Sequence, residues 1–298
     1  MTDWSLTLSA PAKINLYLGV HTERDARGYH KVDSLMAAVG LADTVTVAPA
    51  QELTVQTVPA SDFPMQKNTA YRAAAAMAEH YGREANICVT IDKRIPLCAG
   101  LGGPSTDAAA VIVALAELWC VDRNDPALDD IARGIGADVP FFLHASPAFY
   151  VGGGDVLATE YPALPATPVV LVKPREASVS TIEAYRRFDE TPVPAEKPGA
   201  IASALRLGDA ETAYAFVHNN LGVISAQMEP QIQTVLDWLR AQDGTVAVDV
   251  CGSGACSFAI CNTAATAANL AEAAQQNGWW SCATELIPST VRVEVPKK

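Results

Sequence analysis

The fold of this chain is decided by one stretch, residues 91–119, which has the sequence IDKRIPLCAGLGGPSTDAAAVIVALAELW. Its start completes a strand expected over residues 86–92, where apolar and polar residues alternate. Its end, from Ser105 to Trp119, is strongly apolar and predicts a buried helix. Between the two lies a glycine-rich loop, Gly100-Leu101-Gly102-Gly103. A strand, a glycine-rich loop and a helix in this order predict backbone amides that converge on an anion at the helix N-terminus.

The residues around the loop favour a phosphate as that anion. Side chains in the loop would block phosphate oxygens, which is a physical reason for its glycines. Ser105 and Thr106 follow with hydroxyl groups suited to phosphate oxygens or a bound Mg²⁺. Lys93 and Arg94, just before the loop, are expected to supply positive charge. The loop lacks the lysine of the Walker A pattern. A flexible connection before a capped helix is the alternative interpretation.

Pro104 is an unusual residue for a phosphate-binding loop. It has no N–H group, so the loop has one donor fewer for a phosphate. We expect Gly103 to be the N-cap of the helix and Pro104 to occupy the first helical position, where its fixed φ is suitable.

The rest of the chain mixes strands and helices. Strands are expected over residues 14–20, 44–47, 53–58, 169–172, 245–250 and 257–261, and helices over residues 69–81, 232–240 and 264–276. The early strands follow one another without long helical connections, which favours an α+β fold over a doubly wound parallel sheet. Gly152-Gly153-Gly154 marks the expected boundary between an N-terminal domain, residues 1–155, and a C-terminal domain, residues 156–298.

Composition excludes several classes of protein. Of the 298 residues, 50% are hydrophobic and 18% are charged, which is typical of a globular chain. A formal net charge of −12 repels nucleic acid and anionic membranes, so neither is an expected partner. The seven cysteines include no C-x-x-C pair, which favours free thiols in a reducing cytoplasm. Residues 1–4 lack the basic and apolar regions of a signal peptide, which also favours a cytoplasmic location.

Two charged residues are candidates for chemistry. On the first strand, Lys13, Asn15 and Tyr17 alternate with apolar residues and are expected to share one face, toward solvent or a cleft. Asp138 lies near the apolar run Phe141-Phe142-Leu143, where an unpaired buried carboxylate would be costly. A cation such as Lys13 would lower that cost. A carboxylate, an ammonium group and a hydroxyl-bearing substrate are the components of base-assisted phosphoryl transfer.

Two further clusters leave alternatives open. In Arg27-Gly28-Tyr29-His30, an aromatic ring beside an imidazole either binds a planar base or forms a surface turn with nothing bound. The segment Cys251-Gly252-Ser253-Gly254-Ala255-Cys256 either brings its backbone close to a ligand or makes a tight bend between two core strands; alone, it favours the bend. The five histidines have no spacing typical of a zinc site.

Taken together, these motifs resemble the kinase superfamily of galactokinase, homoserine kinase, mevalonate kinase and phosphomevalonate kinase. The superfamily motifs stand in the usual order, PAKINL at residues 11–16, the glycine-rich loop at residues 96–106 and GSGA at residues 252–255. The stretches at residues 11–18, 27–30, 91–96 and 136–140 resemble the branch whose acceptor is 4-diphosphocytidyl-2-C-methyl-D-erythritol, in the non-mevalonate isoprenoid pathway.

This resemblance implies a fold and an activity. The fold is an N-terminal domain like domain 2 of ribosomal protein S5 and a ferredoxin-like C-terminal domain, with ATP and substrate in the cleft between them. The activity is transfer of the γ-phosphoryl group of ATP to the 2-hydroxyl of the acceptor, which gives the 2-phosphate and ADP. Mg²⁺ would accompany ATP without a dedicated protein site, beyond a contact with Ser105 or Thr106. The protein would be a monomer or a homodimer.

The resemblance also implies roles for single residues. Asp138 would be the general base, and Lys13 would orient it and stabilise developing charge. The implied substrate-binding residues are Asn15 for the methylerythritol part, Tyr29, His30 and Tyr185 for cytosine, and Thr181. The implied ATP-binding residues are Pro96, Leu97, Cys98, Ala99, Gly100, Leu101, Gly102, Gly103, Pro104, Ser105, Thr106 and, on the adenine side, Asn68.

The chain departs from the usual pattern of this branch on the nucleotide side. Pro104 replaces a glycine, Thr106 replaces a serine, and Cys251 replaces a threonine that begins the third motif. None of these changes removes a catalytic group that the resemblance implies.

Two rival functions are a sister kinase acting on homoserine- or mevalonate-type alcohols and a non-catalytic regulatory relative. Tyr29, His30 and Tyr185 argue against the sister kinase, because those acceptors have no base to stack on. The presence of both Lys13 and Asp138 argues against a relative that has lost catalysis.

Overall fold

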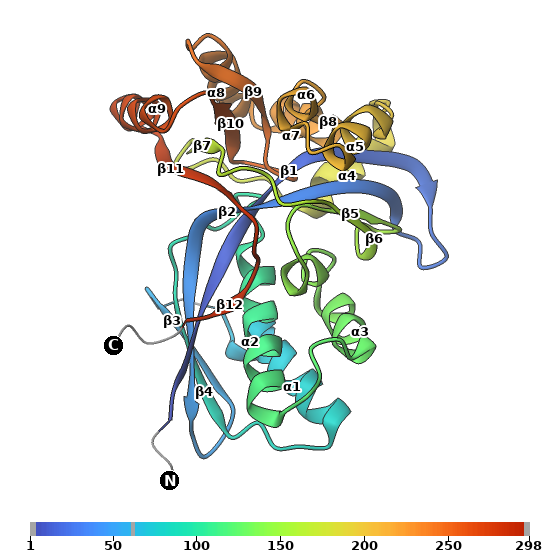
Figure 1. Cartoon of the computed structure of the whole chain (residues 1–298), viewed down its shortest axis with the longest axis vertical. Helices are drawn as coiled ribbons and strands as arrows, with labels where there is room; N and C mark the ends of the chain where they lie inside the picture. The colour runs from blue at the N-terminus through green and yellow to red at the C-terminus, as the bar shows by residue number, and fades with distance from the viewer. Residues whose placement is uncertain (1–3, 61–62, 295–298) are drawn as a thin grey trace.

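The computed structural model describes residues 4–60 and 63–294; residues 1–3, part of the segment inspected for a signal peptide, lie outside that range (Figure 1). Its strands are β1 Leu6–Arg24, β2 His30–Pro49, β3 Thr54–Val58, β4 Ile87–Asp92, β5 Ala148–Val151, β6 Val156–Glu160, β7 Pro168–Lys173, β8 His218–Asn219, β9 Thr245–Val250, β10 Ser257–Cys261, β11 Trp280–Ile287 and β12 Arg292–Val293. Its helices are α1 Thr69–Tyr81, α2 Gly103–Trp119, α3 Pro126–Ile135, α4 Thr181–Glu190, α5 Gly199–Arg206, α6 Ala210–Tyr214, α7 Asn220–Met228, α8 Pro230–Arg240 and α9 Ala264–Gln276, with short 3₁₀ helices η1 Met65–Lys67 and η2 Pro140–Leu143.

Helix α2 is the centre of the N-terminal half. Its run of alanine, valine and leucine is apolar on every side, so nearly all of the helix is buried, as expected for such a sequence. It shares one hydrophobic core with the inner faces of α1, β1, β2 and β4. Figure 1 shows α1, α2 and α3 together on one side of these strands.

The start of α2 differs from the expectation by one residue. Gly102, not Gly103, is the N-cap, with a left-handed φ of 75°. Glycine takes this conformation without steric penalty, so the chain turns into the helix one residue earlier. Pro104 therefore occupies the second helical position, and its carbonyl oxygen accepts a hydrogen bond from Thr69 Oγ1 at 2.5 Å.

The C-terminal half has a ferredoxin-like arrangement. Its strands lie in the order β11-β7-β10-β9, and each neighbouring pair is antiparallel. Helix α8 precedes β9 and helix α9 precedes β11, and both pack on the same face through apolar residues of β7 and β10. This is the β-α-β-β-α-β order of a ferredoxin-like domain. The expected α+β fold is confirmed.

The two halves share one sheet. Strand β11 also pairs with β2, where Leu286 lies opposite Val39, so the sheet runs from one half into the other. The chain first leaves the N-terminal half through the hairpin of β5 and β6, which turns at Gly152-Gly153-Gly154. The division at residue 155 stays a prediction.

Candidate active site

A cavity of about 630 Å³ lies where the two halves meet. It is lined by Lys13, Asn15, Leu18, Arg24, Gly28, Tyr29, His30, Val32, Ser34, Gly100, Gly102, Ser105, Ala137, Asp138, Gly153, Gly154, Thr181, Ile182, Tyr185, Arg186, Asp189, Leu221, Gly252 and Ser253. The structure therefore brings together the Lys13–Asp138 candidates, the glycine-rich loop and the proposed aromatic residues, which are far apart in sequence.

Lys13 and Asp138 form an ion pair in the lining of the cavity. The Nζ atom of Lys13 is 3.4 Å from Oδ2 of Asp138 and donates a hydrogen bond of 2.8 Å to Oδ1 of Asn15. Nδ2 of Asn15 in turn donates to Oγ of Ser34 at 2.9 Å. The Lys13 side chain is 4% exposed, whereas the Asp138 side chain is 36% exposed. The carboxylate is therefore accessible from the cavity, and a buried ammonium group lies behind it.

A β-bulge sets which residues of β1 face this cavity. The pairing of β1 with β2 shifts between Asn15 and Tyr17, so Leu16 is the extra residue. A bulge reverses the alternation of side chains beyond it. Lys13, Asn15 and then Leu18 line the cavity, while Tyr17 is buried beside His218. The expectation that Tyr17 shares the face of Lys13 and Asn15 is wrong for this reason.

The glycine-rich loop is held by backbone hydrogen bonds on two sides. The Leu101 carbonyl accepts from the Lys13 amide at 3.0 Å. The Cys98 carbonyl accepts from the Ala255 amide at 3.0 Å, and the Ala99 carbonyl from the Cys256 amide at 3.2 Å. The flexible-connection alternative therefore does not describe this loop. The same hydrogen bonds place the GSGA motif against the glycine-rich loop. The motif is therefore more than a tight bend between two core strands.

Gly100 is required by this contact. Its φ is +72°, and a Cβ atom at this position would overlap the carbonyl oxygen of Cys251. Gly252, from the same segment as Cys251, approaches Lys13 so closely that a Cβ atom there would lie 3.2 Å from Nζ.

The N-terminus of α2 offers few free groups. The amides of Ser105 and Thr106 both donate to the Gly102 carbonyl, at 3.0 and 2.9 Å. The Ser105 side chain lines the cavity. The hydroxyl of Thr106 is buried, does not line the cavity, and has no hydrogen-bond partner among the described residues. Donors to an anion are therefore expected from Gly102 and Gly103, since Pro104 has none.

Lys93, the first of the two basic residues before the loop, does not supply free charge. Lys93 Nζ forms an ion pair with Asp43 and another, 2.6 Å long, with Asp107. Burial raises the pKa of Asp107 to about 7, because two carboxylates share one ammonium group in a dry site. Arg94 points into solvent, 3.8 Å from Asp92. The expectation that Lys93 adds positive potential for a phosphate is wrong, because its charge is already balanced.

Another part of the cavity, which we call the aromatic end, is lined by His30 and Tyr185. The rings of His30 and Tyr185 are stacked, with centroids 5.4 Å apart and an interplanar angle of 29°. His30 Nδ1 lies 2.7 Å from the His21 carbonyl oxygen and must donate to it, since a carbonyl oxygen only accepts. Nε2 is buried without a hydrogen-bond partner among the described residues, although Oδ1 of Asp189 is 3.2 Å away. Burial and the nearby Asp138 raise the pKa of Tyr185 to about 12. This end therefore offers a flat surface and an unused ring nitrogen.

The remaining candidate residues differ in how they relate to the cavity. Tyr29 is 62% exposed on the turn between β1 and β2. Thr181 Oγ1 is 2.8 Å from Ser253 Oγ, which joins α4 to the GSGA motif. Asn68 is the N-cap of α1, and its side chain accepts from the Ala70 amide at 2.9 Å. Asn68 does not line the cavity, and of the loop residues Pro96 to Thr106 only Gly100, Gly102 and Ser105 do.

Sequence reasoning missed several residues that line the cavity. Ser34, which orients Asn15, lies on β2 and has no local motif; only the pairing of β1 with β2 reveals it. Arg186 and Asp189 on α4 follow Tyr185 by one and four residues, and the i, i+4 spacing from that aromatic could have indicated Asp189. Among residues 4–60 and 63–294, no group of three or more His, Cys, Asp or Glu could hold a metal ion. No helix in the same ranges has the length and hydropathy needed to cross a membrane.

The fold and this cavity define a GHMP kinase. The model of the GHMP kinase N-terminal domain matches residues 68–146, and the model of the GHMP kinase C-terminal domain matches residues 201–278. Homoserine kinase from Cytophaga hutchinsonii has the same fold, with a TM-score of 0.73 at 18% identity over 97% of each chain.

Relatives with higher sequence identity show which family of GHMP kinases the chain belongs to. A 4-diphosphocytidyl-2-C-methyl-D-erythritol kinase of Mycobacterium bovis is 34% identical over 289 residues, which is 94% of this chain and 89% of the relative. The Mycobacterium avium kinase of that name is 35% identical over 89% of this chain and 85% of its own length. A crystal structure of 4-(cytidine 5'-diphospho)-2C-methyl-D-erythritol kinase superposes with a TM-score of 0.76 at 33% identity, over 94% of this chain and 98% of that one. The chain belongs to the 4-diphosphocytidyl-2-C-methyl-D-erythritol kinase family.

Proposed function

We propose that this protein transfers the γ-phosphoryl group of ATP to the 2-hydroxyl of 4-diphosphocytidyl-2-C-methyl-D-erythritol. The observation that carries the proposal is one cavity lined by both a carboxylate–ammonium pair and stacked aromatic rings. Phosphoryl transfer to an alcohol needs the first, and a nucleotide-linked acceptor explains the second. Family membership supports the same reaction.

Asp138 acts as the general base in this proposal. It takes the proton of the 2-hydroxyl as the oxygen bonds to the γ-phosphorus of ATP, and the bond from that phosphorus to the bridging oxygen breaks to release ADP. Lys13, 3.4 Å from the carboxylate, orients it and stabilises the charge that develops on the transferred group. Asn15 holds the ammonium group through its 2.8 Å hydrogen bond and contacts the methylerythritol part.

The aromatic end binds the cytosine. Tyr29 and Tyr185 provide ring faces for the base, and base–aromatic stacking contributes about 1–3 kcal/mol per base in nucleic-acid complexes. In the tautomer whose Nδ1 carries the proton donated to the His21 carbonyl, Nε2 of His30 is an acceptor, which complements the exocyclic amino group of cytosine. Thr181 binds the acceptor near the junction with Ser253.

ATP lies along the glycine-rich loop in this proposal. Residues Pro96 to Thr106 surround its phosphates, with donors from the amides at the start of α2, and Asn68 lies on the adenine side. The proposal for Asn68 is the least direct, because its side chain already caps α1.

Mg²⁺ fits this site as a companion of ATP. The Ser105 side chain lines the cavity and is the protein ligand we propose, with the phosphate oxygens supplying the others. The buried hydroxyl of Thr106 fits this role less well. The ion would neutralise negative charge on the transferred phosphate.

We also propose a cytoplasmic location and a monomeric or homodimeric state, without nucleic acid as a partner. All seven cysteines lie in the described part of the chain as free thiols, which fits a reducing compartment. The net charge of −12 opposes binding to a phosphodiester backbone.

The proposal is tested by measuring ADP release with a panel of acceptors at equal concentration. The cytidyl substrate is expected to be phosphorylated, whereas homoserine and mevalonate are not, because they leave the aromatic end empty. Turnover of another alcohol without turnover of the cytidyl substrate would indicate a sister kinase. Absence of turnover with every acceptor, in the presence of ATP binding, would indicate a non-catalytic relative.

A further inference from the structure

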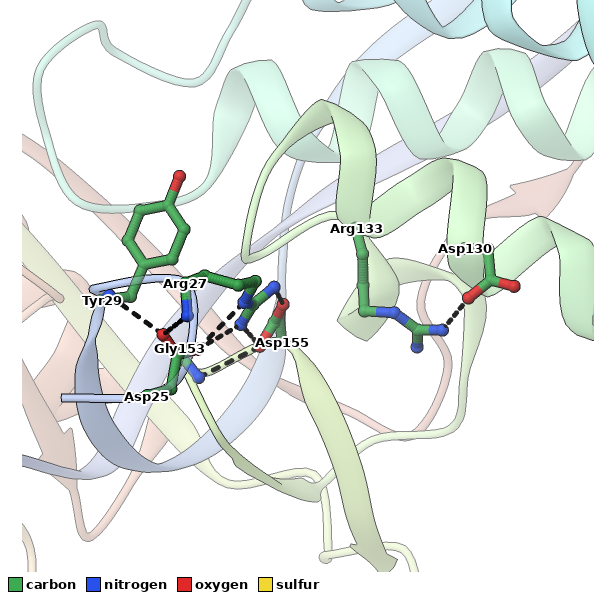
Figure 2. A network of polar contacts seen from close by, with 7 residues as sticks. All are labelled: Asp25, Arg27, Tyr29, Asp130, Arg133, Gly153 and Asp155. Carbon is green, nitrogen blue, oxygen red and sulfur yellow. Dashed lines mark hydrogen bonds and ion pairs between the residues drawn. The ribbon is translucent and has the colours of Figure 1, made fainter.

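The turn that carries Tyr29 is connected to the turn between β5 and β6 by a polar network (Figure 2). Oδ1 of Asp25 accepts hydrogen bonds from the amides of Arg27 and Tyr29, at 2.9 and 3.0 Å. The amide of Asp25 donates to the Tyr29 carbonyl at 2.7 Å. Both backbone polar groups of Tyr29 are therefore fixed by one aspartate, although the ring itself is exposed.

Arg27 connects this turn to a second segment. Its two terminal nitrogens donate to the two carboxylate oxygens of Asp155, at 2.6 and 3.0 Å, and Nε donates to Oδ2 of Asp25 at 2.9 Å. A bidentate pair of this kind fixes direction as well as distance. The guanidinium carbon also lies 5.2 Å from the centre of the Tyr29 ring, within the range of a cation–π contact.

Asp155 is a rigid anchor. Its side chain is 4% exposed, and Oδ1 also accepts from the Gly153 amide at 3.1 Å. The same Gly152–Gly154 turn is bonded to β2, where the Val32 amide donates to the Gly152 carbonyl at 2.8 Å. Asp155 is therefore fixed relative to the sheet. Its bidentate pair with Arg27 fixes the turn that carries Tyr29 in the same way. Gly153 and Gly154 line the cavity beside Tyr29.

We propose that Arg27 and Asp155 are positioning residues that fix the Tyr29 ring at the mouth of the cavity for the base of the nucleotide-linked acceptor. The proposal rests on the proposed function for the identity of that base. The side-chain hydrogen bonds of Arg27 and Asp155 lie within the Tyr29 turn and the Gly152–Gly154 turn. The two residues therefore affect the affinity for the acceptor and not the affinity for ATP.

The first experiment substitutes Arg27 by alanine in the full chain. Calorimetric titration with cytidine 5'-diphosphate is expected to give a dissociation constant about tenfold higher than that of the unmodified protein. The KM for the acceptor is expected to rise by a similar factor, and the KM for ATP to change by less than about twofold. Arg133, whose pair with Asp130 is also drawn in Figure 2, provides the control: Arg133→Ala removes an arginine–aspartate pair on α3 and should alter none of these values.

A second experiment separates positioning from general stabilisation. If Arg27 acts through Tyr29, Arg27→Ala should have almost no further effect on cytidine diphosphate binding in a Tyr29→Ala background. Arg27→Lys keeps the charge but not the bidentate geometry, and we expect it to restore only part of the affinity. It also provides a folded variant if Arg27→Ala fails to fold.

Two outcomes would overturn the proposal. The first is unchanged cytidine diphosphate affinity in a folded Arg27→Ala or Asp155→Asn variant. The second is that Arg27→Ala lowers this affinity by the same factor in the unmodified protein and in the Tyr29→Ala background. The proposed function is judged separately, by turnover of the cytidyl substrate in the unmodified protein. If the unmodified protein phosphorylates the cytidyl substrate but Arg27→Ala leaves cytidine diphosphate affinity unchanged, the positioning role is wrong and the proposed function stands.

Discussion

Lys13 is the residue on which the geometry of the site depends most. Its ammonium group is almost completely buried, so it needs partners, and it finds them in Asn15, which Ser34 orients, and in Asp138. The same ion pair that makes burial of the lysine tolerable thus directs a carboxylate into the cavity. The Lys13–Asp138 ion pair therefore contributes both to stability and to the geometry of the site.

Asp138→Asn tests the role of that carboxylate. The amide keeps the size of the side chain and one oxygen near Lys13 but cannot take a proton. We expect kcat to fall by about 10² or more, with affinity for a non-hydrolysable ATP analogue changed by less than about threefold. Steady-state kinetics and calorimetry measure the two quantities. A variant that keeps near-normal turnover would show that another group is the base.

At the residue scale, the sequence supports local inferences and misses distant ones. The alternation along β1 correctly placed Lys13 and Asn15 on one face, because their spacing lies before the bulge. It failed for Tyr17, since a bulge depends on how the partner strand is paired. The neutralisation of Lys93 could not be foreseen either, because Asp43 lies 50 residues away along the chain.

At the scale of elements, the glycine-rich loop is shaped by its contact with the GSGA segment. Cys98 and Ala99 accept backbone hydrogen bonds from Ala255 and Cys256, and Gly100 fits against the Cys251 carbonyl. The strand–loop–helix pattern predicted the helix almost to its ends. The loop's conformation was not predictable, since it depends on a segment about 150 residues later in the chain.

Gly100→Ala tests this contact between elements. The added methyl group meets the Cys251 carbonyl and must also adopt a left-handed φ, so we expect the free energy of unfolding to fall by about 2 kcal/mol or more and the KM for ATP to rise. Gly134→Ala is the matched control, because nothing lies near its Cβ position in α3, and it should raise stability by about 0.5–1 kcal/mol. Urea denaturation measures both. Equal stabilities for the two variants would contradict the contact.

Strand β9 gives the fold a pH dependence. Burial raises the pKa of Asp249 from 3.8 to about 7. Between these values the folded state holds a proton that the unfolded state has lost, so the free energy of unfolding falls as pH rises, and it levels off above pH 7. Asp249→Asn lacks this titration. Its stability relative to the unmodified protein should increase by about 1–3 kcal/mol between pH 5 and pH 8.

Urea denaturation of both proteins at several pH values isolates this effect, because every other titrating group is shared. A stability difference that stays constant from pH 5 to pH 8 would show that Asp249 does not titrate in this range.

At the scale of the molecule, one sheet joins two differently built halves and leaves the cavity where they meet. The α+β class followed from the order of strands and helices along the chain, and the ferredoxin-like half followed from the resemblance. The pairing of β11 with β2 was not predictable, because it joins residues almost 250 positions apart through two short stretches of ordinary strand sequence. Thr181 and Tyr185 on α4 line the same cavity as Lys13 and Asp138.

The position of the new phosphate on the acceptor tests the central claim most directly. The 2-carbon of the methylerythritol part carries a methyl group and no hydrogen, so a 2-phosphate has no proton on the carbon that bears it. We expect the product of ATP and 4-diphosphocytidyl-2-C-methyl-D-erythritol to give a phosphomonoester ³¹P signal that stays a single line without proton decoupling, together with one ADP per product. A signal split by neighbouring protons, or no ADP release with this acceptor, would contradict the account.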